Sequence, residues 1–295
     1  LAPAGAAYAG QARVDGAVAG QALVLTSPIA VTENAIALDQ LEARVGALEA
    51  RGRAHIGARG LSANLALGGA IDNLVAGASG AVEGQLTLTP DALALDARLT
   101  NARLGELRAR TAAIEASGPL GAIDAAFSLD GRLRRAPLTF AGASRISISD
   151  EATSMRLEGR GALGGAELVT RAPMTLSWSR VGFDGAFDLA LADGGVRGHW
   201  RERGRALSGA AHIDDAPLAP IAAIWDERAS GRVAGNFALA SAGAGLTGSA
   251  DLAFTDARFA GRQNGATEAR CGARIPPARH PRNAPPTRNR SRESP

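Results

Sequence analysis

The sequence predicts an all-β fold: an antiparallel β-sheet whose strands each have one apolar face, with one short helix near residues 216–226. Apolar and polar residues alternate in short runs along most of the chain, as in Met174-Thr-Leu176-Ser-Trp178. A period of two places successive side chains on opposite faces of a strand, so each run has one apolar face. Turn signals such as Asp193-Gly194-Gly195 separate the runs.

The alternating runs predict the strands in chain order. They lie around Val14–Val18, Leu23–Val31, Ile36–Leu38, Leu86–Leu88, Leu93–Leu99, Phe127–Leu133, Arg145–Ile148, Met155–Leu163, Met174–Trp178, Phe183–Leu191, Val196–Trp200, Val233–Leu239 and Leu246–Phe254. Because few helical patterns interrupt this succession, we expect the strands to pair antiparallel.

Two segments depart from the period of two. Leu38, Leu41, Val45 and Leu48 have the spacing of a helical stripe, but glycines interrupt the region and alternation resumes beyond it, which favours strands. Near residue 216, acids and prolines precede apolar residues at 218, 221, 224 and 225. That pattern starts a helix with one apolar side, and we expect about two turns.

A weak similarity between two segments of the chain indicates an internal repeat. Asp96-Ala-Arg-Leu-Thr-Asn-Ala-Arg-Leu104 resembles Asp251-Leu-Ala-Phe-Thr-Asp-Ala-Arg-Phe259 over nine positions. In a composition dominated by Ala, Gly and Leu such a match can also arise by chance, so both a true repeat and coincidence stay open.

The charge distribution separates a body from a tail. The chain of 295 residues has no lysine, and from residue 262 onward eight arginines face two glutamates. The remaining 24 arginines and 27 acids make residues 1–261 mildly acidic, without a basic stripe, which argues against nucleic acid as a partner. Residues 262–295 are rich in Arg and Pro, so we expect disorder; an out-of-frame terminus fits the same composition.

No residue pattern points to catalysis, a cofactor or a metal. One cysteine, Cys271, excludes an internal disulfide, and the absence of lysine excludes a lysine nucleophile or a phosphate-loop lysine. His212 lies near Asp214 and Asp215, but a surface histidine before a capped helix explains the trio better than a metal site. His199 is expected on the polar face of its strand. We therefore expect a non-enzymatic protein.

Residues 214–261 carry a family resemblance. A short apolar helix, Ala216-Pro-Leu-Ala-Pro-Ile-Ala-Ala-Ile-Trp225, leads into Ser230-Gly-Arg-Val-Ala-Gly-Asn-Phe-Ala-Leu239 and another alternating strand. This order resembles TamB, the inner-membrane component of the translocation and assembly module, within the AsmA-like family. On this reading residues 1–261 are a fragment of an AsmA/TamB-like β-trough, which implies an elongated, twisted antiparallel β-sheet curled into an apolar trough. No amino-terminal anchor is visible, and family members are several times longer.

The resemblance implies a periplasmic cell-envelope scaffold, anchored to the inner membrane through a segment absent here. Such proteins are implicated in phospholipid transport between the inner and outer membranes and in outer-membrane protein assembly and secretion. The implied partners are phospholipid acyl chains and, through missing parts of the parent, an outer-membrane assembly barrel.

The alternation independently predicts one apolar face, and the resemblance implies that this face lines a path for lipid. The candidate lining residues are Met174, Leu176, Trp178, Phe183, Phe187, Leu189, Leu191, Phe237, Leu239, Leu252 and Phe254. The alternative is a segment of a secreted β-solenoid adhesin or passenger. Adhesin repeats usually carry polar ladders, whereas the repeated residues here are Leu, Val, Phe and Ala.

Overall fold

The computed structural model describes residues 8–18, 20–72, 74, 77–204, 206–242, 245–259 and 269–275. Over these residues, eighteen strands form one sheet and one short helix, α1 (Leu218–Ala223), interrupts their succession. The strands are β1 (Tyr8–Val18), β2 (Gln21–Val31), β3 (Ala35–Val45), β4 (Leu48–Gly57), β5 (Gly60–Ala70), β6 (Ala78–Leu88), β7 (Ala92–Leu104), β8 (Leu107–Pro119), β9 (Ala122–Leu133), β10 (Ala136–Ile148), β11 (Ala152–Leu163), β12 (Ala166–Ser179), β13 (Gly182–Leu191), β14 (Gly194–Arg203), β15 (Ala206–Pro217), β16 (Ala229–Ala242), β17 (Gly245–Phe259) and β18 (Ala269–Ile275). The predicted all-β fold with one short helix is confirmed.

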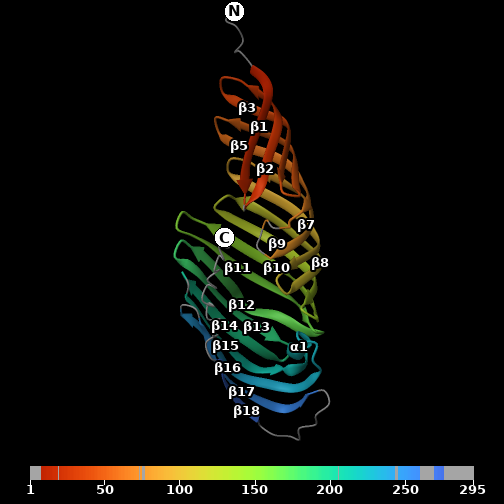
Figure 1. Ribbon diagram of the computed structural model, residues 1–295, viewed down its shortest axis with the longest axis vertical. Coiled ribbons are helices and arrows are strands. Elements are labelled where there is room, and N and C mark those ends of the chain that lie inside the picture. The colour runs from red at the N-terminus through yellow and green to blue at the C-terminus, as the bar shows by residue number, and fades with distance from the viewer. Residues whose placement is uncertain are drawn as a thin grey trace, which may run out of the picture.

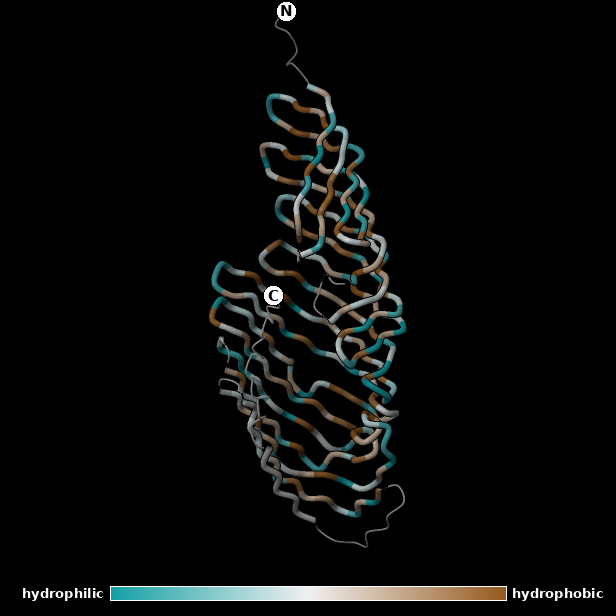
Figure 2. The backbone as a smooth tube through the Cα atoms, viewed as in Figure 1, coloured by the Kyte–Doolittle hydropathy of each residue, from teal (hydrophilic) through white to brown (hydrophobic). Residues whose placement is uncertain are grey.

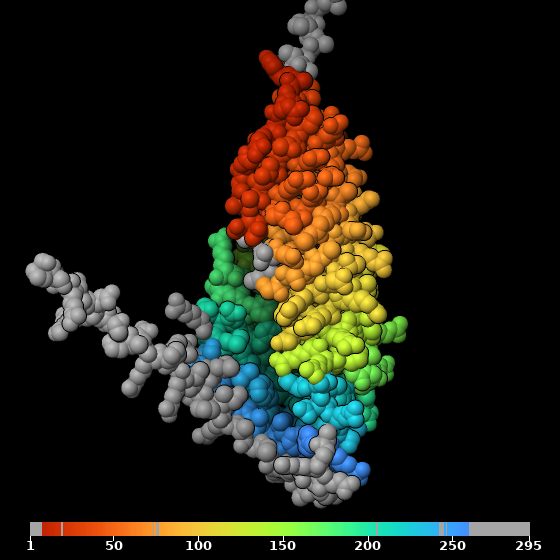
Figure 3. All heavy atoms as spheres, turned by 45° about the vertical axis from the view of Figure 1, so that its right-hand side comes forward, coloured from red at the N-terminus to blue at the C-terminus, as the bar shows by residue number. Residues whose placement is uncertain are grey.

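The sheet is an antiparallel meander. Consecutive strands pair with each other from β1–β2 through to β17–β18, so their order in space follows the chain. The strands succeed one another along the long axis, and the sheet twists and curls so that the molecule is hollowed (Figures 1 and 3). Connections therefore alternate between two lateral edges. We call the edge with the turns after even-numbered strands edge A, and the opposite one edge B.

The pairing register collects the apolar residues of the strands on one face. Residues paired across antiparallel strands point to the same side of a sheet. One row crosses ten strands, β3 to β12, with a single polar member: Leu41, Gly52, Leu65, Leu86, Leu95, Ala116, Ala125, Ser144, Leu157 and Met174. A second row crosses β9 to β17: Ile123, Ile146, Met155, Leu176, Gly185, Trp200, Gly209, Leu239 and Gly248. We call this side the apolar face.

The opposite side is the polar face. Arg44 and Glu49, 2.8 Å apart, and Asp184 and Arg201, 2.6 Å apart, are direct cross-strand partners there. Hydrophilic and hydrophobic positions alternate along the strands in Figure 2. The alternation in sequence therefore corresponds to two chemically distinct faces of one sheet.

A β-bulge explains the helix-like spacing near residue 40. Leu38 pairs with Ala54 and Leu41 pairs with Gly52, and the register shifts between them. Leu38 and Leu41 are three residues apart, a spacing that would place them on opposite faces of a regular strand. The extra residue of the bulge compensates for this, so both leucines point to the apolar face. Leu41 is buried there. The prediction of strands in this region is confirmed.

Glycines make room for aromatic rings on the apolar face. A Cβ built on Gly185 would lie 2.4 Å from the indole ring of Trp200 on the next strand. A Cβ on Gly198 would lie 2.8 Å from the ring of Phe187. These rings therefore cover the backbone of the neighbouring strand where no side chain displaces them.

The helix packs on the apolar face at edge B. It begins at Leu218, two residues later than the segment predicted from the sequence, because Pro217 still pairs with Arg232 as part of β15. Ala216, Leu218 and Val233 form a buried cluster, against which Ile213, Ile221, Leu252 and Phe254 pack. This cluster fixes α1 over strands β14 to β17.

The two similar segments, 96–104 and 251–259, also have matching backbone geometry. Asn101 in β7 and Asp256 in β17 both have a φ of 51°. Each faces a left-handed glycine on the preceding strand, Gly80 or Gly231, where the register shifts. The preceding strands also match, as Ala78-Ser-Gly-Ala-Val-Glu-Gly84 and Ala229-Ser-Gly-Arg-Val-Ala-Gly235. The similarity therefore extends over two hairpins, β6–β7 and β16–β17, and favours a true repeat over coincidence.

Strand β18 lies inside the segment that we expected to be disordered. It pairs antiparallel with β17 from Gly248↔Ile275 to Phe254↔Ala269. The expectation does not hold for these seven residues, since their sequence alternates and β17 offers unpaired backbone groups. The rest of residues 262–295 lies outside the described residues.

The contact between Gly185 and Trp200 gives a test of the packing. We expect Gly185→Ala to lower the free energy of unfolding by about 1–3 kcal/mol, because its Cβ must displace the indole ring. Gly68→Ala is the matched control, since its Cβ would meet nothing within 4 Å. Urea unfolding followed by circular dichroism measures both. Equal effects of the two substitutions would contradict the proposed packing.

Candidate functional site

The apolar face holds all eleven residues that the sequence analysis selected as lining. The pairings Phe187↔Gly198, Gly198↔Ala211 and Ala211↔Phe237 carry the face from β13 to β16. Further pairings place Leu189, Leu239 and Leu252 on the same side. The selected residues therefore share one surface, as expected from their spacing; contact with lipid stays a prediction.

Three of the eleven take part in the protein's own packing. Leu191 is only 3% exposed. Leu252 and Phe254 pack against the cluster around α1. The other eight keep half-buried or exposed side chains, and Trp178 is 41% exposed. The accessible part of the lining is thus the β12–β16 region rather than its carboxy-terminal end.

Aromatic rings form a continuous row on this surface. Trp178 and Phe183 have ring centroids 5.4 Å apart, Phe183 and Trp200 5.9 Å, and Phe187 and Trp200 5.8 Å. Trp178 stands next to the β12–β13 turn at edge A, and Phe187 lies further into the sheet. The row gives a track of aromatic surface from the edge inward.

Several lining residues were missed by the selection from sequence. Trp200 belongs to the aromatic row, and Leu65, Leu86 and Leu95 occupy the same face in the amino-terminal half. The alternating runs around 86–99 and 196–200 already contained the signal for Leu86, Leu95 and Trp200. Only the register shows that these strands and the carboxy-terminal strands share one face.

Edge B is closed beside this surface by α1 and the residues after it. Arg135 in the β9–β10 turn forms an ion pair with Asp226, 91 positions later in the chain. The guanidinium of neighbouring Arg134 lies 5.6 Å from the ring centroid of Trp225. A Cβ on Gly164, in the β11–β12 turn, would lie 3.0 Å from Pro220. The segment therefore spans the turns of several hairpins along this edge.

Arg232 of β16 links the residues on either side of this segment to the neighbouring turns of the sheet through two acids. Its Nη1 donates a hydrogen bond to Asp193 at 2.7 Å, and its Nε lies 2.7 Å from the carboxylate of Asp215. The hydrogen bond from Arg232 holds the pKa of Asp193 below its usual value, and a bond from the backbone of Asp193 lowers it further. Asp193 follows β13 and Asp215 lies near the end of β15, both at edge B, so this contact also belongs to the closed edge.

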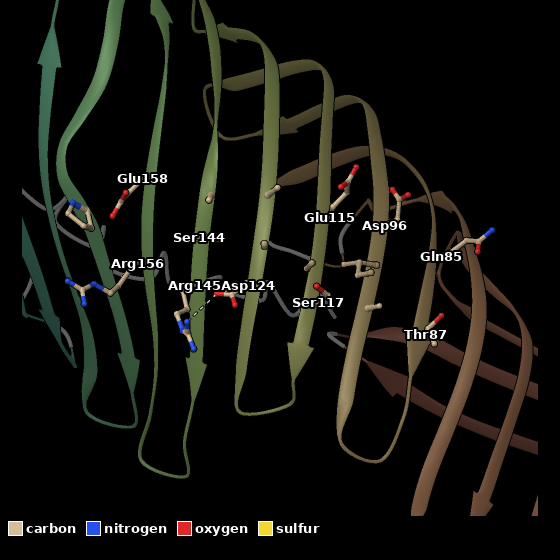
Figure 4. Close-up of a pocket in the computed structure, with 17 residues that line it drawn as sticks. Gln85, Thr87, Asp96, Glu115, Ser117, Asp124, Ser144, Arg145, Arg156 and Glu158 are labelled. Carbon is tan, nitrogen blue, oxygen red and sulfur yellow. Dashed lines mark ion pairs between the residues drawn. The ribbon is translucent and has the colours of Figure 1, made fainter.

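A hollow of about 1110 Å³ lies on the polar face, opposite the predicted lining. Its walls come from seven neighbouring strands, β6 to β12 (Figure 4). A twisted open sheet is saddle-shaped, so each of its faces is concave in one direction. The charged residues at the hollow have both signs: Asp96, Glu115, Asp124, Glu158, Arg145 and Arg156. Asp124 and Arg145 form an ion pair at 3.7 Å.

The histidines that the sequence analysis considered lie on β14 and β15. Nδ1 of His212 lies 2.9 Å from the side-chain oxygen of Asn236, while Asp215 pairs with Arg232. His199 is exposed on the polar face, as expected. Within the described ranges, no three His, Cys, Asp or Glu residues are grouped as metal ligands. The described part of the chain also has no helix with the length and apolar character needed to cross a membrane.

Comparisons with family models, with curated proteins and with solved structures found no match to this chain.

The Arg232–Asp193 contact predicts a pH effect. We expect Arg232→Gln to raise the pKa of Asp193, because the hydrogen bond to the ionised carboxylate is lost. In the wild type the folded-state pKa is lowered. The stabilisation is therefore complete above the unfolded value of about 3.9 and is lost as the pH falls through the folded one. NMR titration of the Asp193 carboxyl carbon measures this. Arg160→Gln is the control; a shift equal in both variants contradicts the assignment.

Proposed function

We propose that this chain is a non-enzymatic segment of a cell-envelope scaffold whose apolar face carries phospholipid acyl chains. The observation that carries the proposal is the continuity of that face: paired apolar or small residues extend from β3 to β17 with few polar interruptions. Shielding an acyl chain from water is favourable by about 0.8 kcal/mol per methylene. A surface of this length can shield a whole chain.

The chemistry of the lining suits a sliding ligand. Leu, Ala, Met and aromatic side chains offer many similar contacts, and the glycines between them leave space above the backbone of the sheet. Within the two rows the hydrogen-bond donors are few, the indole N–H of Trp200 and the hydroxyl of Ser144, so most of this surface offers contacts without a preferred direction. It therefore favours flexible hydrocarbon chains over a peptide, whose backbone groups would lack partners.

The antiparallel meander supports the scaffold over the β-solenoid adhesin. A solenoid stacks successive coils with parallel pairing, whereas the strands described in this sheet pair antiparallel. The resemblance of residues 214–261 to TamB proteins supports a periplasmic setting, anchorage to the inner membrane through a segment outside this sequence, and cooperation with an outer-membrane assembly barrel. Phospholipid transport between the two membranes and assistance in outer-membrane protein assembly are the functions proposed for the parent.

A face-specific crosslinking experiment tests the proposal. Leu239 lies between Gly209 and Gly248, so a bulky photo-reactive phenylalanine fits there. The neighbouring residue Ala238 points to the polar face and serves as the matched control. We expect phospholipid adducts from position 239 and few from 238 when the full chain is irradiated with vesicles of bacterial phospholipid.

The pair Leu189 and Asp188 on β13 repeats the comparison, because these residues also point to opposite faces. Equal labelling at the two members of both pairs, or no adduct at any of the four positions, would refute acyl-chain binding on the apolar face.

A further inference from the structure

We propose that acyl chains reach the apolar face through a mouth at edge A, formed by Trp178, Val181 and Leu207 around the β12–β13 turn. The inference rests on the proposed function and adds to it the position of access and the chemistry of the lipid headgroup. The occupant is a glycerophospholipid whose acyl chain lies on the aromatic row.

The exposed apolar side chains concentrate at edge A. Large hydrophobic residues that are exposed at strand ends or turns on this edge are Tyr8, Ile56, Leu61, Leu120, Ile148, Trp178, Val181 and Leu207. Edge B carries fewer of them, and it carries most of the ion pairs, including Arg44–Glu49, Arg134–Glu106, Arg135–Asp226 and Arg232–Asp193. The two edges of the same sheet thus differ in chemistry.

Between β9 and β17, access from edge B is obstructed. The segment 218–226 lies on the apolar face and along the turns of this edge, held by the Arg135–Asp226 ion pair and the contact of Pro220 with Gly164. At the other ends of these strands Val181 is 67% exposed and Leu207 38% exposed. An acyl chain that enters sideways therefore meets exposed apolar side chains of the sheet at edge A, whereas at edge B the segment 218–226, whose Trp225 is 56% exposed, lies across the route.

The aromatic row leads inward from this mouth. Its consecutive ring centroids, 5.4 to 5.9 Å apart, connect Trp178 at the edge to Phe183, Trp200 and Phe187. A row one ring wide that starts at an exposed edge matches the shape of a linear hydrocarbon chain.

Two side chains of opposite charge, Arg180 and Glu202, lie at the mouth besides the ion-paired group of Asp184, Arg201 and Arg203. Arg180 stands in the turn beside Val181, and Glu202 pairs with Phe183 at the edge of the apolar face. Neither forms an ion pair with another residue in the described part of the chain, whereas nearby Asp184 is engaged by Arg201 and Arg203. A headgroup with a phosphate and an ammonium complements these charges: the guanidinium faces the phosphate and the carboxylate faces the amine. Phosphatidylethanolamine has this headgroup chemistry.

The three tryptophans provide reporters at three positions: Trp178 at the mouth, Trp200 inside, and Trp225 beside the covered edge. Full-length variants that keep one tryptophan, with the others changed to Phe, are mixed with phosphatidylethanolamine vesicles whose acyl chains are brominated. Bromine quenches indole fluorescence on contact. We expect quenching of Trp178 and Trp200 and little quenching of Trp225. Far-ultraviolet circular dichroism verifies that each variant retains its strands, and the wild type provides the summed signal.

Charged substitutions at the two edges locate the access route. Val181→Asp should slow the quenching of Trp200 by about tenfold, because a carboxylate then stands where hydrocarbon must pass. Leu104→Asp, at an exposed leucine of edge B, is the matched control and should leave the rate unchanged. Arg180→Gln should reduce the initial rate by about fivefold through loss of one phosphate contact. Glu202→Gln should remove the preference for phosphatidylethanolamine over phosphatidylglycerol.

The outcomes separate the two proposals. If no tryptophan is quenched in the wild type, acyl-chain binding itself is wrong. If Trp200 is quenched but Val181→Asp and Leu104→Asp slow it equally, or Trp225 is quenched as fast as Trp178, lipid binds and the mouth at edge A is wrong. If both headgroups quench at the same rate in the wild type, the assignment of Arg180 and Glu202 to the headgroup is wrong.

Discussion

The register of the antiparallel sheet is the constraint on which the other properties of this protein depend. Because side chains alternate with a period of two, a slip of one residue between any two strands would move the apolar residues of every later strand to the other face. The structure contains several register shifts, yet the apolar rows continue across them. At Leu38 and Leu41 the extra residue of a bulge compensates an odd spacing in the sequence. Irregular positions in the strands thus preserve the distinction between the two faces.

A single curled sheet leaves its apolar face only partly covered. Much of this face is half-buried by neighbouring side chains of the same sheet, and a dense core forms locally, around Ala216, Leu218 and Val233. Elsewhere the cross-strand pairs and the backbone ladder carry the stability. An exposed continuous apolar surface is unusual for a folded chain and favours a ligand or partner that covers it. This is the physical basis of the proposed role in carrying acyl chains.

The two matching hairpins share one strand pattern but are preceded by different connections. Hairpins β6–β7 and β16–β17 share a left-handed residue opposite a left-handed glycine, at Asn101 with Gly80 and at Asp256 with Gly231. The connections that precede them both lie at edge B, but only the one before β16 contains a helix in the described residues. The strand pattern of the two hairpins is thus repeated, but the connections before them differ. Only the connection before β16 carries a described helix, and this helix covers the apolar face there.

The sequence by itself determined the fold class, the two-faced character of the strands, and the short helix before β16, because these follow from local periodicity and from prolines and acids at a helix start. It also placed the eleven candidate residues on one face. Tertiary structure alone decided that Leu191, Leu252 and Phe254 are packed within the protein, that edge B is covered by contacts such as Arg135–Asp226, and that residues 269–275 extend the sheet. These properties depend on which distant segments meet, and spacing along one strand carries no information about the partner that a side chain or an open strand edge will find.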